Sequence, residues 1–262
     1  MKKKQPLVSI FMPTYNHARF LDNSIKSILD QKYKNIVIVI GDDCSTDNSK
    51  NIILKYKNLH PNKIKFYENK KNIGVSKHFK DLYNKCEGDY IAHFSGDDIF
   101  YPDKIEKQVA FMELNKDCVL CGHDTDIIDK NGNLMNYKFS DLNPITRGRG
   151  LKNIIENGTC FPGPSWLVRK NKDKKIEFDE KIKYRNDWKL LIDIVGNDSR
   201  YDFIEGIFSA YRIHDKNLSS KFSFDKYFDI IKIIKHTLLI SNKIIIIYWI
   251  KFFLNSLLRK MK

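Results

Sequence analysis

The sequence lacks the features by which several specialised classes of protein are recognised. Its 262 residues contain only five cysteines, in no even framework, so a disulfide-stapled secreted domain is excluded and a reducing compartment is expected. Cys118 and Cys121 form one close pair, and a zinc knuckle would need a second pair, so both are predicted to be buried strand thiols. No apolar leader of the secretory kind follows Met1, and no internal repeat is visible.

Negative charge is also scarce. The chain has 32 Asp and Glu residues against 46 Lys and Arg residues, a formal net charge of +14. Such a surplus favours polyanionic partners, namely nucleic acid, anionic lipid or phosphorylated substrates. An AT-rich genome would also enrich lysine, so charge alone does not choose among them. Apolar residues make up 42% of the chain, enough to build a sizeable core, and this excludes a disordered protein.

No apolar run reaches the length of about 20 residues that a membrane-spanning helix needs. The stretch 244–254 comes nearest, but Lys251 lies within it and Asn242 and Lys243 precede it. We therefore expect 221–262 to form a basic, apolar helical tail. Two interpretations stay open: the tail lies in the membrane interface with its lysines turned to water, or it packs on the domain or on a second subunit.

The first hundred residues alternate between strand and helix patterns. The expected strands are short apolar runs at 7–12, 35–40, 64–67 and 90–94. A helical spacing of apolar residues follows each of these strands. Asp22 and Asn23 are expected to cap the first helix, and further helices are expected at 47–56, 75–85 and 102–114. This alternation predicts an α/β fold with a mostly parallel central sheet flanked by helices, Rossmann-like in outline.

After residue 100 the pattern is less regular. Residues 118–138 are expected to form two strands joined by a turn at Asn131-Gly132. The polar, glycine-bearing stretch 141–150 is expected to be a mobile loop.

Polar side chains follow the predicted strands at the points where they end. Pro13, Thr14 and Asn16 follow the first strand, Asp42 and Asp43 the second, and Ser95, Asp97 and Asp98 the fourth. Ligands of open α/β sheets bind beyond these carboxyl ends. Adjacent aspartates also serve as turn formers and helix caps, but clustering at successive strand ends favours a cation. Mg²⁺ or Mn²⁺, held by one or two carboxylates plus substrate phosphates, would satisfy such a cluster.

Six stretches, in this order, resemble glycosyltransferase family 2, the inverting transferases with an A-type nucleotide-binding fold. They are Val8-Ser9-Ile10-Phe11-Met12-Pro13-Thr14-Tyr15-Asn16, 41–49, 69–74 with 88–91, Phe94-Ser95-Gly96-Asp97-Asp98-Ile99 with 102–105, 178–180 with 186–188, and 211–214 with Asn217 and Ser219. The resemblance runs from about residue 7 to 219. It implies a transferase domain over 1–220, with a nucleotide-binding half at 1–100 and an acceptor-binding half at 101–220, followed by the tail 221–262.

The resemblance also implies roles for individual residues. Asp187 would be the general base, Asp97 the metal ligand, and Asp98 its support or a contact to the sugar. Asp42 or Asp43 would read the edge of the nucleotide base, and Arg212 and His214 would face the diphosphate. Together with these, the residues that would line the donor site are Pro13, Thr14, Asn16, Asp42, Asp43, Asn72, Gly74, Ser95, Arg212 and His214. The implied cofactor is Mn²⁺ or Mg²⁺.

Two residues depart from the family pattern. Ser95 stands where a carboxylate is usual, which predicts weaker metal affinity or a different ribose contact. Asn186 stands where an acidic residue usually precedes the base, and losing that negative neighbour should lower the pKa of Asp187.

The implied reaction moves a sugar from a nucleoside-diphosphate sugar, expected to be a UDP-sugar, to a hydroxyl of a glycan or lipid-linked saccharide. By analogy the pathway is bacterial surface polysaccharide synthesis, in the cytoplasm at the inner face of the plasma membrane. Three alternatives stay open: a non-catalytic basic protein that binds membrane or nucleic acid, a nucleotidyltransferase on a similar fold, and a family member that binds its donor without turnover. Nucleic acid is disfavoured because acidic strand ends would repel it. Trp166 and Trp188 are expected either to stack on an acceptor sugar or to pack in the core.

Overall fold

The computed structural model describes residues 5–143, 145–151, 154, 161–171, 176, 179, 181–215, 217 and 228–233. Its strands are β1 (Val8–Thr14), β2 (Ile36–Asp42), β3 (Ile64–Glu68), β4 (Tyr90–His93), β5 (Ile99–Phe100), β6 (Cys118–Ile128), β7 (Leu134–Lys138), β8 (Gly148–Arg149), β9 (Leu167–Arg169) and β10 (Arg200–Arg212). Its helices are α1 (Ala18–Leu29), α2 (Ser49–Leu59), α3 (Val75–Tyr83), α4 (Lys104–Leu114), α5 (Phe139–Leu142) and α7 (Asn186–Val195), with a 3₁₀ turn η1 (Gly163–Ser165).

The strands form one mixed sheet in the order β3-β2-β1-β4-β9-β6-β10-β5, with β7 beside β6 and β8 beside β10. The pairs β2–β3, β1–β2 and β1–β4 are parallel, while β9 runs antiparallel to both β4 and β6. Thr14 lies opposite Asp42, so the carboxyl ends of β1 and β2 coincide. The predicted α/β fold with a central sheet flanked by helices is confirmed.

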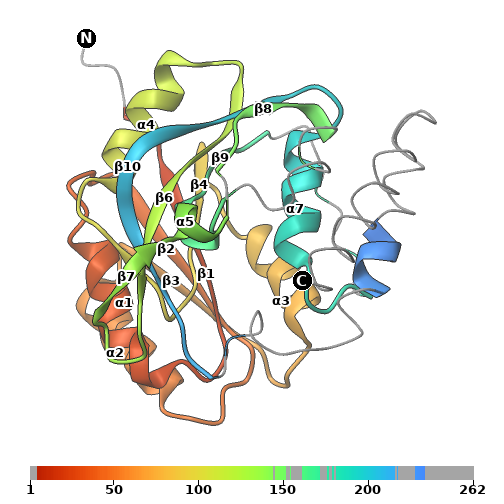
Figure 1. Ribbon diagram of the computed structural model, residues 1–262. Coiled ribbons are helices and arrows are strands. Elements are labelled where there is room, and N and C mark those ends of the chain that lie inside the picture. Colours follow the sequence, from red (N-terminus) through yellow and green to blue (C-terminus); the bar gives the residue numbers. More distant parts are fainter. Residues whose placement is uncertain are drawn as a thin grey trace.

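The alternation of side chains along β1 divides the core in two. Ile10 and Met12 pack on the same side of the sheet as residues of α1, α2 and α4, whereas Phe11 packs on the side of α3 and α7. Figure 1 shows α1 and α2 on one side of the sheet and α3 and α7 on the other. Both faces are covered, which explains why β1 and β2 read as unbroken apolar runs.

The cap predicted for the first helix is wrong. α1 begins at Ala18, so Asp22 and Asn23 lie inside it. The free amides at its start are satisfied from the loop after β2, because Asp47 Oδ2 accepts the Ala18 N–H at 3.0 Å and Ser49 Oγ accepts the His17 N–H at 3.0 Å. A cap supplied by a distant segment leaves no local pattern in the sequence.

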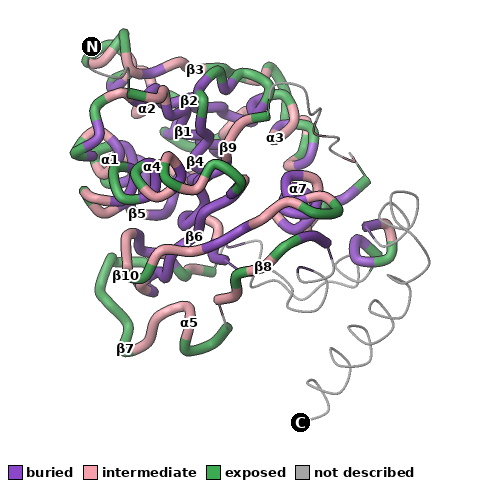
Figure 2. The backbone as a smooth tube through the Cα atoms, turned by 90° about the horizontal axis from the view of Figure 1, so that it is seen from above, coloured by how far each residue is buried: buried purple, intermediate pink, exposed green. Residues whose placement is uncertain are grey.

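The hairpin predicted over 118–138 is confirmed as β6 and β7, which pair antiparallel. The stretch 141–150, expected to be a mobile loop, contains some regular structure, because α5 ends within it and β8 pairs with β10. Asp124 anchors α5 by accepting the N–H and hydroxyl of Ser140 at 3.1 and 2.6 Å. In Figure 2 this β7–α5 connection lies at the periphery, away from the buried strands.

Both tryptophans belong to the core, since Trp166 is 1% and Trp188 2% exposed, so neither is available to stack on a sugar. Cys118 and Cys121 are buried thiols, as predicted. The tail predicted at 221–262 lies outside the described residues except for 228–233, a helical turn whose Ile230 and Ile233 are buried in the core shared with α7. Within the described chain, no helix has the length and apolarity to cross a bilayer.

Candidate active site

A turn between β4 and β5 holds the two aspartates that the sequence placed at a strand end. The N–H of Asp98 donates to the carbonyl of Ser95 at 3.3 Å, and the Asp98 carbonyl accepts the hydroxyl of Ser24 at 2.8 Å. Asp98 Oδ1 accepts the N–H of Arg212 at 3.0 Å, at the end of β10. Both carboxylates are almost fully buried. The turn is therefore fixed by α1 on one side and by the last strand on the other.

His214 joins this turn from 117 residues further along the chain. Its Nε2 lies 2.9 Å from Asp97 Oδ2, and Asn217 Nδ2 lies 3.4 Å from the same oxygen. The Asn217 side chain also accepts the His214 N–H at 2.5 Å. The structure thus brings Asp97 and His214, both expected at the donor site, into direct contact.

Asp97 and Asp98 favour different protonation states. Burial acts to raise the pKa of Asp97, but the hydrogen bond from His214 and the nearby His17 outweigh it and bring that pKa to about 2. Burial and the adjacent charge of Asp97 raise the pKa of Asp98 well above its usual value. Asp97 is therefore the ionised member of the pair, while Asp98 favours its neutral form unless a cation approaches.

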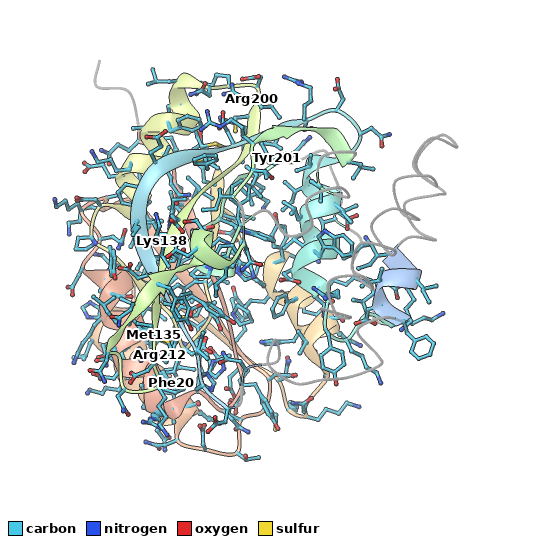
Figure 3. The ribbon with its side chains drawn as sticks, viewed as in Figure 1. Phe20, Met135, Lys138, Arg200, Tyr201 and Arg212 are labelled. Carbon is cyan, nitrogen blue, oxygen red and sulfur yellow. The ribbon has the colours of Figure 1, made fainter. Side chains whose placement is uncertain are left out.

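Arg212 holds the turn through its guanidinium. Its Nε donates to the Asp97 carbonyl at 2.7 Å and one terminal nitrogen to the Asp129 carbonyl at 3.1 Å. The guanidinium carbon stands 4.9 Å from the ring centre of Phe20, and Figure 3 shows the two side chains close together. Arg212 is 3% exposed. These contacts suit a residue that fixes the turn rather than one that faces a diphosphate, the role the resemblance implies.

A small cradle lies beside the turn, at Gly96. A Cβ atom there would stand 2.6 Å from His17 Nδ1 and 3.2 Å from Thr14 Oγ1, so only glycine fits without a shift. Both Thr14 Oγ1 and His17 Nδ1 are buried and have no hydrogen-bond partner. Buried polar atoms without a hydrogen-bond partner are uncommon, so these two atoms are candidates for a contact to a ligand. Sequence reasoning overlooked His17, although it directly follows Asn16.

Asn16 and Asp42 tie the ends of β1 and β2 together. Asn16 has a φ of +56°, its N–H donates to Ser45 Oγ at 2.9 Å, and its Oδ1 accepts the Thr46 N–H at 2.8 Å. Asp42 accepts the N–H of Ser45 at 2.8 Å and its hydroxyl as well. Pro13, one residue before Thr14, pairs with Gly41 of β2.

Asp43 organises the loop that leads into α3. Its Oδ1 accepts Asn69 Nδ2 at 2.8 Å and the Ile73 N–H at 2.9 Å, and its Oδ2 accepts the Gly74 N–H at 3.1 Å. Asn72 Nδ2 donates to the Asp43 carbonyl at 3.2 Å. Gly74 has a φ of +83°, a conformation that favours glycine. Asp43, Asn72 and Gly74 are thus brought together, because Asp43 accepts the Gly74 N–H with its carboxylate and the Asn72 side chain with its carbonyl.

A cavity of about 410 Å³ connects the turn to α7. Ser95, Asp98 and Asn217 line one part of it, and Asp187 lines another. Aromatic rings and cationic side chains complete the wall, from Phe139, Tyr184, Tyr211, Lys183 and Arg185. Of the predicted site residues, the cavity brings together only Ser95, Asp98 and Asp187. The others are not part of its wall, namely Pro13, Thr14, Asn16, Asp42, Asp43, Asn72, Gly74, Asp97, Arg212 and His214.

Asp187 lies in the first turn of α7, where its Oδ1 accepts the Trp188 N–H at 2.8 Å. Burial raises the pKa of Asp187 above its usual value, so the lowering expected from Asn186 is outweighed. Asn186 is itself buried and bonded to α3, since its Oδ1 accepts the Ser76 hydroxyl at 2.8 Å. Asn186 therefore anchors α7, a role in which a charged side chain would be costly.

Across the described residues, no three His, Cys, Asp or Glu side chains converge as a metal cage would. The protein ligands available at the turn are the Asp97 carboxylate and the His214 imidazole.

The sequence matches the model of Glycosyl transferase family 2 over residues 9–177. An uncharacterized glycosyltransferase of Methanocaldococcus jannaschii, MJ1057, is 31% identical over 220 residues, 81% of this chain and 73% of that protein. TuaG of Bacillus subtilis, a putative teichuronic acid biosynthesis glycosyltransferase, is 28% identical over 59% of this chain and 61% of its own length.

Two solved structures share the fold. TarS 1–349 of S. aureus, in complex with UDP-GlcNAc, superposes with a TM-score of 0.72 at 20% identity, over 90% of this chain and 68% of that one. The mannosyltransferase PcManGT of Pyrobaculum calidifontis, in complex with GDP-Man and Mn²⁺, gives a TM-score of 0.64 at 11% identity, over 92% and 66%.

Proposed function

The chain belongs to glycosyl transferase family 2 and is a glycosyltransferase, and from this we propose that it transfers a sugar from a UDP-sugar to a hydroxyl of a saccharide acceptor, with inversion. The observation that carries the proposal is the single cavity lined by both Asp98 and Asp187. One displacement needs a donor, a base and an acceptor hydroxyl within reach of one another, and this cavity links the Asp98 side of the turn to the base.

The donor would bind at the strand ends, with its phosphates over the Gly96 cradle. Thr14 Oγ1 and His17 Nδ1 are buried without partners there and are suited to bond phosphate or ribose oxygens. The Asn16 and Asp43 networks shape the neighbouring loops, where Asp42 or Asp43 would read the base edge. The UDP-GlcNAc complex of TarS supports a uridine nucleotide as donor carrier.

A divalent cation, Mn²⁺ or Mg²⁺, fits the Asp97 side of the turn. Asp97 favours its ionised form, and the His214 imidazole beside it would supply a nitrogen ligand once the metal replaces the proton that Nε2 shares with Asp97. Few protein ligands are needed, because such cations take the rest from substrate phosphates and water. When bound, the cation would neutralise charge on the departing diphosphate. The Mn²⁺ complex of PcManGT supports this assignment.

Asp187 is the base in this scheme. Its raised pKa lies closer to the operating pH than that of an exposed aspartate, which makes it a better proton acceptor. It would take the proton of the acceptor hydroxyl as that oxygen attacks the anomeric carbon. Phe139, Tyr184 and Tyr211 offer rings on which the acceptor sugar can rest. The product would carry the inverted anomeric configuration, since the displacement occurs once.

The acceptor would be a glycan or lipid-linked saccharide of a bacterial surface polysaccharide. The likeness to TuaG supports this pathway. A contact between residues 221–262 and the inner membrane surface belongs to the same proposal.

The test is donor binding and hydrolysis across a panel of nucleoside-diphosphate sugars, with and without Mn²⁺, for wild type, Asp97→Asn and Asp187→Asn. We expect one UDP-sugar to bind only with metal, Asp97→Asn to lose that binding, and Asp187→Asn to bind but not turn over. Binding without turnover in wild type would indicate a non-catalytic family member. Turnover of a nucleoside triphosphate with a sugar phosphate would indicate a nucleotidyltransferase instead.

A further inference from the structure

We propose that the acceptor carries an anionic group, a carboxylate or a phosphate, close to the hydroxyl that is glycosylated, and that Arg185 binds this group. The inference rests on the proposed function of the cavity and names the class of acceptor it takes.

Arg185 is placed to contact the acceptor. It is the residue just before α7 and stands two positions ahead of Asp187. Both side chains line the same cavity. Because Asp187 must face the attacking hydroxyl, a group that Arg185 binds lies near the reacting oxygen.

The Arg185 side chain has an unmet donor. Its Nε is buried and has no hydrogen-bond partner. Among the described residues, no carboxylate forms an ion pair with it, Asp187 included. A guanidinium has five N–H donors and no acceptor, and burying one of them without a partner costs stability. An incoming anion would meet the terminal nitrogens first, because Nε is buried, and a small shift of the side chain would let it bond Nε as well, in the paired geometry that arginine forms with carboxylates and phosphates.

The charge pattern of the cavity separates this anion from the donor phosphates. The donor phosphates belong beside Asp97 and His214, which pair with each other at the strand ends. Arg185 and Lys183 come instead from the segment that enters α7, together with Tyr184. A cavity wall that holds a tyrosine and two cationic residues suits an acidic sugar or a sugar phosphate better than a neutral saccharide.

Binding of matched small acceptors tests the proposal. The full chain would be saturated with UDP and Mn²⁺ to fill the donor side, and ligand-observed NMR would then compare methyl glucoside, methyl glucuronide and methyl glucoside 6-phosphate. The variants are Arg185→Gln, Arg185→Lys and, as the matched control, Lys181→Gln, which removes an exposed positive charge from the same loop. The uronide and phosphate arms distinguish the two sources of negative charge.

For wild type we expect at least one anionic sugar to bind about 10- to 100-fold more tightly than the neutral one, the range of a charge-assisted pair. Arg185→Gln should reduce that preference to about twofold or less, Arg185→Lys should keep part of it, and Lys181→Gln should leave it unchanged. The affinity for UDP should stay within about twofold in all variants, because the donor lies at the strand ends.

The proposal would be overturned if wild type bound all three sugars with equal affinity. It would also be overturned if wild type bound none of them. An anionic preference that survives Arg185→Gln would overturn it too, as would a loss of UDP affinity in that variant, which would assign Arg185 to the donor. Failure of wild type to bind UDP or any UDP-sugar would instead reject the proposed function. The preference for acidic sugars can then still be measured without nucleotide.

Discussion

Asp229 offers a sharp test of how the predicted base is held. It is fully buried, and its Oδ2 accepts the N–H groups of Lys183 and Tyr184 at 2.9 and 2.7 Å. Those residues begin the segment that leads into α7 and Asp187. Replacing Asp229 with alanine would leave both amides without their acceptor, while Ile230 and Ile233 keep their place in the core.

The expected loss of stability follows from the two hydrogen bonds that Asp229 Oδ2 accepts. Each is a hydrogen bond to a carboxylate, and losing one costs about 1.5–3 kcal/mol, so we expect Asp229→Ala to lower the free energy of unfolding by about 3–6 kcal/mol. The contact of Lys232 Nζ with Oδ1, at 3.4 Å and half exposed, adds little. Asp229→Asn can keep one acceptor oxygen in place and should lose about half as much.

Urea denaturation and acceptor-dependent turnover would measure the effect. Turnover should fall at least about tenfold in Asp229→Ala, because a base displaced by a fraction of an ångström loses its alignment. The affinity for UDP should be unchanged. Asp30→Ala, which removes an exposed carboxylate after α1, is the control and should stay within about 0.5 kcal/mol of wild type. An equally small change in Asp229→Ala would refute the reasoning.

Three further predictions concern other residues. Transfer should decline on acidification from a higher pH than for an ordinary aspartate, because the raised pKa of Asp187 protonates the base earlier; Asp187→Asn should lose about 10²–10⁴-fold of the rate and this acid limb with it. Gly96→Ala should lower the thermal midpoint and weaken UDP-sugar binding, because its Cβ would lie 2.6 Å from His17 Nδ1 and push the His17 side chain aside. Unchanged binding, measured by calorimetry, would exclude the cradle from the donor site. Burial lowers the pKa of Lys104 to about 7, whereas the unfolded chain keeps the ordinary lysine pKa of 10.5. Between these two pH values the unfolded chain binds more protons than the folded one, so the stability of wild type should rise with pH there. In Lys104→Met the free energy of unfolding should depend less on pH in the same range. An equal dependence on pH in wild type and variant, measured by denaturation at several pH values, would contradict this.

The sequence predicted those features that depend on local pattern. Two-faced burial of β1 and β2 produces unbroken apolar runs, so the parallel strands β1 to β4 and their acidic ends could be inferred from the chain alone. The antiparallel pairings of β9 with β4 and β6 were not predicted. The contact between Asp97 and His214 was not visible in this way. Asp97 was predicted from its place at a strand end, and His214 came from the family resemblance, which places both at one site without saying that they touch.

What could not be predicted arises from contacts between distant segments. The caps of α1 come from Asp47 and Ser49, so the local candidates Asp22 and Asn23 were misassigned. The pKa of Asp187 depends on burial, which the identity of its neighbour Asn186 does not reveal. His17 and Arg185 became candidates only when their unpartnered nitrogens were found, since arginine and histidine are common in loops of a basic chain.

The position of β10 has a consequence for synthesis of the protein. This strand inserts between β6 and β5 and carries the residues that close the Asp97–Asp98 turn. A ribosome must therefore release the chain to about residue 217 before His214 and Asn217 can reach Asp97. The parallel strands β1 to β4 are available much earlier, so a nascent chain would hold an exposed sheet edge and an incomplete turn until β10 arrives. Activity would then begin abruptly, late in translation, and a chain cut before β10 would form part of the sheet but no donor site.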